Sequence, residues 1–249
     1  MTWLLALDID GTLAPIAETP SDARVPAEVL ADLRKLAARP DVHLVFLTGR
    51  DGAAAYRLVP IPQATFAPEH GACIYAPGEL KAWLDEGGKA PPLGPALLEW
   101  EKRCNPPEGA LIERKTTSLA LHTRRLQPGD ATKALESAAT LAESLGLAVL
   151  RGRGVVEVAE RLASKRDALE TIAASIQPQR LSYIGDDTTD IDALLWVQQQ
   201  GGEAYFVLSP ERPTSPHPDL ATLATISEVW AWIGSHVQTS RAGPKISSC

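Results

Sequence analysis

The chain has 249 residues, of which 45% are hydrophobic and 22% are charged, and its formal net charge is -7. This balance is typical of a globular protein with a large core, and the acidic charge argues against binding to the phosphate backbone of nucleic acids. Three widely spaced cysteines, without a Cys/His cluster, argue against a disulfide framework or a zinc site. No run is as long as a membrane span and the opening MTWLLALD lacks a basic leader, so we expect a cytoplasmic protein without membrane contacts.

The first part of the chain predicts alternating strands and helices. Residues 3–7 (WLLAL) and 42–47 (VHLVFL) are short apolar runs, typical of strands that are buried on both faces. Between them, residues 26–38 carry apolar side chains at helical spacing. A strand, a helix and a second strand in this order favour a right-handed crossover and a parallel sheet.

The pattern changes at residues 86–96, whose glycines and prolines indicate a linker. Beyond the linker we expect a helix, a hairpin that turns near Thr116 and Thr117, a second helix and two further strands. The corresponding stretches are 96–104, 110–124, 130–146 and 147–160. This mixture indicates a separate α+β unit.

Strands and helices alternate again after this unit. The predicted elements are a helix, a strand, a helix, a strand and a last helix around Trp230 and Trp232, the first four at 164–176, 180–185, 186–201 and 203–208. We therefore expect an α/β protein with a parallel sheet in a core formed by residues 1–92 and 161–240. The inserted unit would span 93–160, and residues 241–249 would form a flexible tail.

Charged and hydroxyl side chains follow three of the predicted strands. Ligands of parallel α/β sheets gather beyond the carboxyl ends of the strands, so these side chains are expected at one edge. They are Asp8, Asp10, Thr48, Arg50, Asp186, Asp187 and Asp190. Five carboxylates repel one another unless a cation lies between them, and a site made only of hard oxygen ligands favours Mg²⁺.

Two neighbouring carboxylates beside such an ion suit phosphoryl transfer. Asp8 could attack phosphorus and form an aspartyl phosphate. Asp10, two residues later, could protonate the leaving oxygen and then activate water. The reaction needs little beyond this positioning and the neutralisation of charge.

Four motifs, DIDGTL, LTGR, the lysine of ASKRDAL and GDDTTD, together resemble those of haloacid dehalogenase-type phosphatases. Within that superfamily, PEHGA (68–72), IERK…LALHTR and YIGDDTTD resemble trehalose-6-phosphate phosphatases, and the match runs from Leu5 to Leu194. The resemblance implies a Rossmann-like core with a parallel sheet and an inserted α+β cap domain of the C2B type. It also implies a Mg²⁺-dependent hydrolase that releases phosphate from trehalose 6-phosphate.

The same resemblance implies roles for individual residues. Asp8 would be the nucleophile, Asp10 the general acid and base, Thr48 a hydrogen-bond donor to the phosphoryl oxygens, and Lys165 the group that neutralises charge. The metal would be held by the Asp8 side chain, the Asp10 carbonyl and Asp186, with Asp187 and Asp190 in support.

Substrate contacts are implied in both parts of the chain. In the cap they are Glu113, Lys115, Arg124 and Glu157, and in the core they are Glu69, His70 and Gly71, with Asp8 and Asp10 at the phosphate. From the residues alone, the four cap side chains also fit the wet face of an antiparallel sheet, and His122 fits a sheet surface. His70 fits a hydrogen bond at the edge of the core equally well.

The chain departs from the family pattern at three places. Relatives typically have Glu-Val-Arg-Pro where this chain has EVAE (157–160), and Arg166 and Ile191 also differ. The chemical residues are unchanged. Because the first departure lies beside the cap hinge, it bears on which substrate fits.

Other functions stay open at this point. The nearest is a related capped phosphatase for sucrose phosphate or a glycosyl or mannosyl phosphoglycerate. A phospho-acceptor switch also gathers aspartates and a lysine around Mg²⁺, but Asp10 and the inserted unit disfavour it. A sugar-binding protein without activity is the third. For the phosphatase we expect a monomer whose partner is a small-molecule sugar phosphate.

Overall fold

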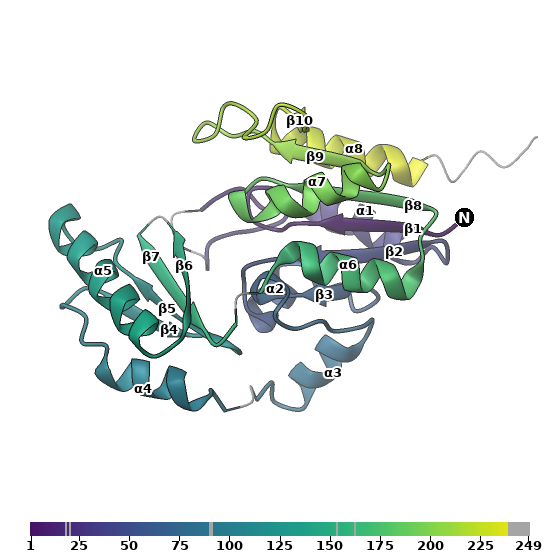
Figure 1. Cartoon of the computed structure of the whole chain (residues 1–249). Coiled ribbons are helices and arrows are strands. Elements are labelled where there is room, and N and C mark those ends of the chain that lie inside the picture. Colours follow the sequence, from purple (N-terminus) through teal and green to yellow (C-terminus); the bar gives the residue numbers. More distant parts are fainter. Residues whose placement is uncertain (18, 20, 90–91, 153, 162, 239–249) are drawn as a thin grey trace, which may run out of the picture. The chain divides into compact units, whose positions relative to one another are not determined.

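The computed structural model describes residues 1–17, 19, 21–89, 92–152, 154–161 and 163–238 (Figure 1). The chain divides into two compact units, one formed by Met1–Gly87 with Ser164–Cys249 and the other by Gly88–Ala163. The first contains a parallel sheet and the second an antiparallel one, which confirms the predicted fold class. The stretch 241–249, predicted as a tail, lies outside the described residues.

The first unit is built on a six-stranded sheet in the order β10-β9-β8-β1-β2-β3, in which every pairing is parallel. Its strands are β1 (Trp3–Leu7), β2 (Val42–Leu47), β3 (Thr65–Ala67), β8 (Arg180–Gly185), β9 (Glu203–Val207) and β10 (Ala221–Leu223). Strands β1, β2, β8 and β9 were expected from their apolar runs. The sequence did not indicate β3 and β10, which have three residues each and are too short to show a pattern.

Helices cover both faces of this sheet. They are α1 (Ala27–Ala37), α2 (Gly52–Leu58), α3 (Glu79–Asp85), α6 (Lys165–Ile176), α7 (Ile191–Gln199) and α8 (Ile226–Gln238), with short 3-10 turns η1 (Glu69–Gly71) and η2 (Thr188–Asp190). Side chains alternate across a strand, so Leu5 of β1 packs with α1 and α8 while Leu4 packs with α6 and α7. Burial on both faces explains why β1 is a continuous apolar run.

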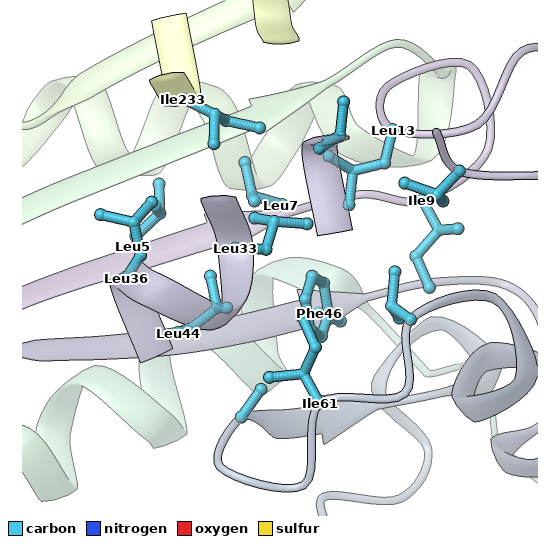
Figure 2. Close-up of a cluster of buried hydrophobic side chains, with 14 of the residues drawn as sticks. Leu5, Leu7, Ile9, Leu13, Leu33, Leu36, Leu44, Phe46, Ile61 and Ile233 are labelled. Carbon is cyan, nitrogen blue, oxygen red and sulfur yellow. The ribbon is translucent and has the colours of Figure 1, made fainter. Parts of the chain in front are cut away.

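The face that carries α1 and α8 has a well-filled core. Figure 2 shows Leu5 and Leu7 of β1 among Leu33 and Leu36 of α1 and Ile233 of α8. Each of these side chains is fully buried. Full burial of one such side chain contributes about 1.5–3 kcal/mol, so this cluster holds β1 firmly in the middle of the sheet.

The second unit is a four-stranded antiparallel sheet in the order β4-β5-β7-β6 with two helices. Its elements are α4 (Pro95–Arg103), β4 (Leu111–Arg114), β5 (Ser118–His122), α5 (Pro128–Ser144), β6 (Ala148–Gly152) and β7 (Val155–Ala159). Strands β4 and β5 form the expected hairpin, closed by a hydrogen bond from Lys115 N to Ser118 O (3.0 Å). Leu119, Leu121 and Val156 pack with α4 and α5 on one face of the sheet.

The other face of the antiparallel sheet is polar. Glu113 of β4 lies opposite Ala120 of β5, and Ala120 lies opposite Glu157 of β7. Residues directly opposite each other in a sheet share a face, so both glutamates project from the side that the helices leave uncovered. We refer to this side as the polar face of the second unit.

Among the described residues, no helix has both the length and the apolar character that spanning a membrane would require.

Candidate active site

Three strands of the parallel sheet bring predicted site residues to the same edge. Leu7 of β1 is in register with Phe46 of β2 and with Ile184 of β8, so the strands end together. Asp8 follows β1 directly, and its backbone N–H donates to the carbonyl of Ile184 (2.9 Å). Thr48 follows β2, and Asp186 follows β8. The carboxyl edge of the sheet therefore positions these side chains together, as expected from the sequence.

Three carboxylates meet at this edge. Asp8, Asp186 and Asp190 each offer an oxygen, and the three oxygens lie within 4.8 Å of one another. Each of the three residues is less than a tenth exposed. Buried like charges at this separation repel strongly, so the cluster needs compensating positive charge.

Lys165 supplies part of that charge. It is the first residue of α6, and its Nζ lies 3.0 Å from Asp8 Oδ1 and 2.6 Å from Asp190 Oδ1. Burial lowers the pKa of Lys165, but attraction to Asp190 and Asp8 outweighs burial and holds the pKa above its ordinary value. The lysine is therefore charged, and one ammonium faces three carboxylates.

The pKa values of Asp8 and Asp186 reflect the excess of negative charge that Lys165 leaves uncompensated. Burial raises the pKa of Asp8 well above its ordinary value, with Lys165 opposing the shift and Asp190 and Asp186 adding to it. Burial, followed by repulsion from Asp190, raises the pKa of Asp186 to about 7. Both shifts mean that the cluster disfavours its own negative charge unless a further cation is present.

Asp190 stabilises the acidic turn after β8, which contains Asp186 and Asp187. Its Oδ1 accepts hydrogen bonds from Lys165 and from the Tyr183 hydroxyl. Its Oδ2 accepts from the backbone N–H groups of Asp186 (3.2 Å) and Asp187 (2.9 Å). Both oxygens of Asp190 are therefore used to fix the turn.

Asp186 has an atom that fits a metal ion. Its Oδ1 is buried and has no hydrogen-bond partner among the described residues. Buried carboxylate oxygens without a partner are costly, and the oxygen lies in a cluster of hard ligands that suits Mg²⁺. Gly11 adds to the fit, because with φ +76° and an ideal Cβ 2.0 Å from Asp186 Oδ2, only glycine lets the turn after β1 pass this close.

Asp10 and Asp187 do not join the central cluster, although all five carboxylates were expected to converge. Both oxygens of Asp10 accept hydrogen bonds from Arg50, from Nε and Nη2, each at 2.6 Å. Arg212 lies 2.5 Å from Asp187 Oδ1 and donates to the backbone carbonyl of Asp186 (2.8 Å). Each outer aspartate thus has its own arginine, which reduces the repulsion at this edge.

Arg212 also shifts the pKa of its partner. Burial raises the pKa of Asp187, but the backbone N–H of Thr188 and the charge of Arg212 outweigh it, so the pKa lies below its ordinary value. The sequence did not single out Arg212 or Tyr183. Arg212 lies in the proline-rich loop after β9, and its only signal was a place beyond the carboxyl end of another strand.

The loop after β2 is fixed by the PEHG segment. The backbone N–H of Glu69 donates to Arg50 O and that of His70 to Thr48 O, both at 2.8 Å. Glu69 and His70 have φ of 51° and 57°, an uncommon conformation for residues with side chains, and such strain is typical of functional sites. A Cβ on Gly49 would lie 2.7 Å from the His70 ring, so the imidazole packs directly on this loop.

The η1 turn also contacts the helix that carries Lys165. An ideal Cβ on Gly71, whose φ is +91°, would lie 2.4 Å from the Cβ of Ala168 in α6. Glu69, His70 and Gly71 therefore join the loop after β2 to α6, and Thr48, which is 1% exposed, lies beside them.

The predicted cap residues lie on or next to the polar face of the second unit. Glu157 accepts hydrogen bonds from Lys115 Nζ and Ser118 Oγ, both at 2.6 Å. Glu113 Oε2 lies 2.7 Å from His122 Nε2. From the sequence, His122 was interpreted as a residue of the sheet surface, and it contacts Glu113, one of the predicted substrate-binding residues. Arg124 is exposed just after β5.

The fold and the site define the class of the protein. A parallel sheet with β1 at its centre, an aspartate at the end of β1, a lysine at the start of α6 and an acidic turn after β8 make it a haloacid dehalogenase-type protein. A model of the trehalose-phosphatase family matches residues 6–226, and the chain therefore belongs to the trehalose-phosphatase family.

Individual relatives agree with this assignment. The chain is 30% identical over 193 residues to a trehalose-phosphate phosphatase of Mycobacterium tuberculosis, covering 75% of this chain and 49% of the relative. It is 31% identical over 196 residues to an uncharacterized glycosyl hydrolase of the same species, covering 75% of this chain and 15% of the relative. The chain thus spans less than half the length of these curated relatives.

A solved structure shows the same fold. The crystal structure of a trehalose-6-phosphate phosphatase related protein superimposes with a TM-score of 0.73 at 20% identity, covering 95% of this chain and 98% of the other.

Proposed function

We propose that the chain is a Mg²⁺-dependent phosphatase that hydrolyses trehalose 6-phosphate to trehalose and phosphate. The observation that carries the proposal is the buried group formed by Asp8, Lys165 and Asp186. In it, a nucleophile, a fixed cation and a carboxylate oxygen that has no hydrogen-bond partner within the described part of the chain meet at one sheet edge. Family membership supports the substrate, because relatives in the family are named trehalose-phosphate phosphatases.

The metal would be held by the carboxylates of Asp8 and Asp186 and the backbone carbonyl of Asp10, with Asp187 and Asp190 fixing the turn. When bound, the ion supplies positive charge that offsets the phosphoryl oxygens and the carboxylates. This assignment is supported by the excess of negative charge at the cluster and by Asp186 Oδ1, for which the described residues offer no hydrogen-bond partner.

The first half of the reaction transfers the phosphoryl group to the chain. A carboxylate oxygen of Asp8 attacks phosphorus, and the bond from phosphorus to the sugar oxygen breaks. Asp10 donates a proton to that leaving oxygen, so trehalose departs as a neutral alcohol. Lys165, 3.0 Å from Asp8, orients the nucleophile and attracts the phosphoryl oxygens, and the hydroxyl of Thr48 donates a hydrogen bond to them.

The second half of the reaction releases phosphate. A water molecule attacks the phosphorus of the aspartyl phosphate, and the bond between phosphorus and the Asp8 oxygen breaks. Asp10, now ionised, takes the proton from the water as it attacks. Asp8 and Asp10 have then both returned to their starting states, so a new substrate can restart the cycle.

The sugar would be recognised by polar side chains in both units. On the polar face of the second unit these are Glu113, Lys115, Glu157 and the neighbouring Arg124, and in the first unit they are Glu69, His70 and Gly71. The pairs Glu113–His122 and Lys115–Glu157 support this role, because carboxylates held by a neighbour present fixed acceptors to sugar hydroxyls.

Phosphate release from a panel of substrates tests the proposal. The panel contains trehalose 6-phosphate, sucrose phosphate, a glycosyl phosphoglycerate and an aryl phosphate, each with Mg²⁺ and with a chelator. We expect the highest kcat/KM for trehalose 6-phosphate and loss of turnover with the chelator. A folded protein that releases phosphate from none of them contradicts the proposal, whereas preference for another sugar contradicts only the substrate.

A further inference from the structure

The guanidinium of Arg50 holds both oxygens of Asp10. Nε donates to Oδ2 and Nη2 to Oδ1, both at 2.6 Å, and the Arg50 side chain is only 13% exposed. Two parallel hydrogen bonds of this kind fix the plane of a carboxylate as well as its position. Asp10 therefore has a single orientation, which Arg50 imposes.

Arg50 is itself fixed by the residues around it. Its backbone N–H donates to Thr48 Oγ1 (3.1 Å), and its carbonyl accepts from the N–H of Glu69 (2.8 Å). Glu69 begins the strained turn with positive φ, and that turn packs against α6. The orientation of Asp10 thus depends on a chain of contacts that begins at the same loop as Thr48.

We propose that Arg50 is the positioning residue of Asp10 in the reaction. This inference rests on the proposed function, in which Asp10 carries a proton to the leaving oxygen and later takes one from water. A guanidinium has donors only, and an Asp10 oxygen that carries a proton is a much weaker acceptor than a carboxylate oxygen, so protonation weakens its bond to Arg50. During turnover, one oxygen of Asp10 gives up its hydrogen bond to Arg50 and bonds to the leaving oxygen of the substrate instead. The other oxygen keeps its hydrogen bond to Arg50, which maintains the orientation of the carboxyl group.

In each half of the reaction, one proton is transferred and one bond to phosphorus forms as another breaks. The proton moves from the released Asp10 oxygen to the leaving oxygen while the phosphorus–oxygen bond breaks and the bond to Asp8 forms. In the second half, the same Asp10 oxygen accepts a proton from water while the bond from water to phosphorus forms and the bond to Asp8 breaks. Arg50 exchanges no proton and acts only through Asp10.

A double-mutant cycle tests this assignment. We expect Arg50→Gln to lower kcat for the sugar phosphate by about 10- to 100-fold, with KM nearly unchanged, because a misaligned Asp10 loses only part of the roughly 10²- to 10⁴-fold that an acid–base group contributes. In the Asp10→Asn background, Arg50→Gln should lower kcat by less than about twofold, because its effect passes through Asp10. Arg57→Gln, an exposed arginine of α2, is the matched control and should leave kcat unchanged.

The aryl phosphate adds a second readout. A good leaving group needs no proton, so Arg50→Gln should form the aspartyl phosphate at a normal rate and then hydrolyse it slowly. We expect a burst of released aryl alcohol and a phosphoenzyme that acid quenching traps in Arg50→Gln and in Asp10→Asn, but not in Arg57→Gln. A variant that lost its fold would instead show a smaller burst of aryl alcohol than the wild type.

Each outcome has a consequence for the inference. Independent, multiplying effects of Arg50→Gln and Asp10→Asn overturn it, as does a change confined to KM. If Arg50→Gln does not fold, Arg50→Lys keeps the charge without the two parallel bonds; an intermediate kcat supports the inference and a wild-type kcat overturns it. If the wild type releases no phosphate, the proposed function fails, and the role of Arg50 fails with it.

Discussion

Lys165 and Asp8 form a buried ion pair in which Nζ lies 3.0 Å from Oδ1, with side chains 2% and 6% exposed. The same ammonium lies 2.6 Å from Asp190 Oδ1. A buried charge that loses its only partner destabilises a protein strongly. Lys165 keeps Asp190 when the charge of Asp8 is removed, so the nucleophile can be tested without loss of the fold.

Replacement of Asp8 by asparagine should abolish turnover and spare the structure. We expect Mg²⁺-dependent phosphate release to fall by more than about 10³-fold, because an amide cannot form the aspartyl phosphate. The Tm should change by less than about 4 °C, the shift that 1 kcal/mol produces in a chain of this size. Asp85→Asn, an exposed change in α3, is the matched control. Residual turnover close to that of the control would contradict the role of Asp8.

Gly11 should tolerate no side chain. In Gly11→Ala the new Cβ would lie 2.0 Å from Asp186 Oδ2, so Asp186 must move and both Mg²⁺ affinity and kcat should fall. Gly78→Ala is a control for the backbone, since Gly78 has φ +88° and nothing within 4 Å of its ideal Cβ. Both variants should lose about 1–2 kcal/mol of stability from the positive φ. Calorimetric titration with Mg²⁺ should give a lower affinity for Gly11→Ala than for Gly78→Ala. Equal affinities would contradict the close approach of Gly11 to Asp186.

The stability of the metal-free protein should fall as the pH rises from about 4 to 7. The pKa of Asp186 is raised to about 7 by burial and by Asp190, so the folded state holds a proton in this range that the unfolded state has released. The loss is about 4 kcal/mol at most, at about 1.4 kcal/mol for each pKa unit. Asp187 has a lowered pKa, and its opposite effect is confined to lower pH.

Thermal unfolding with a chelator and with Mg²⁺ measures this pH dependence. Mg²⁺ should raise Tm more at pH 7.5 than at pH 5, because at low pH it competes with protons for the acidic cluster. A metal-free Tm that rises steadily between pH 5 and 7.5 is the result that would contradict the buried, mutually repelling carboxylates.

The polar face of the second unit should determine affinity for the sugar. Glu157→Gln should raise KM for trehalose 6-phosphate by about tenfold, the effect of one lost hydrogen bond to a charged group, and leave KM for an aryl phosphate unchanged. Glu143→Gln, an exposed change on α5, is the control. Steady-state kinetics on both substrates decide the matter, and equal effects on both would show that Glu157 serves only the fold.

Much of the site could be predicted because it depends on order along the chain. Asp8 and Asp186 each follow an apolar strand, and parallel strands end at the same edge, so their approach follows from topology alone. The partners of the outer carboxylates could not be predicted in this way. Asp10 binds Arg50 and Asp187 binds Arg212, and each pairing depends on side-chain directions in loops that have no periodic pattern.

The backbone of the PEHG segment was also beyond prediction. Glu69 and His70 adopt positive φ although neither residue favours it, because hydrogen bonds to the loop after β2 and packing on α6 stabilise the turn. Such tertiary contacts override local preference, and they are visible only in the folded chain.

The neighbours of β1 also have a consequence for how the protein is made. Its partner β2 is next in the sheet and soon follows in the sequence, whereas β8 follows only after all of residues 88–163. During synthesis one edge of β1 therefore waits unpaired while the antiparallel unit emerges and closes on its own contacts. The acidic cluster forms only when β8 docks, and strand pairing over such a long sequence separation is generally slow and leaves apolar strand edges exposed to aggregation.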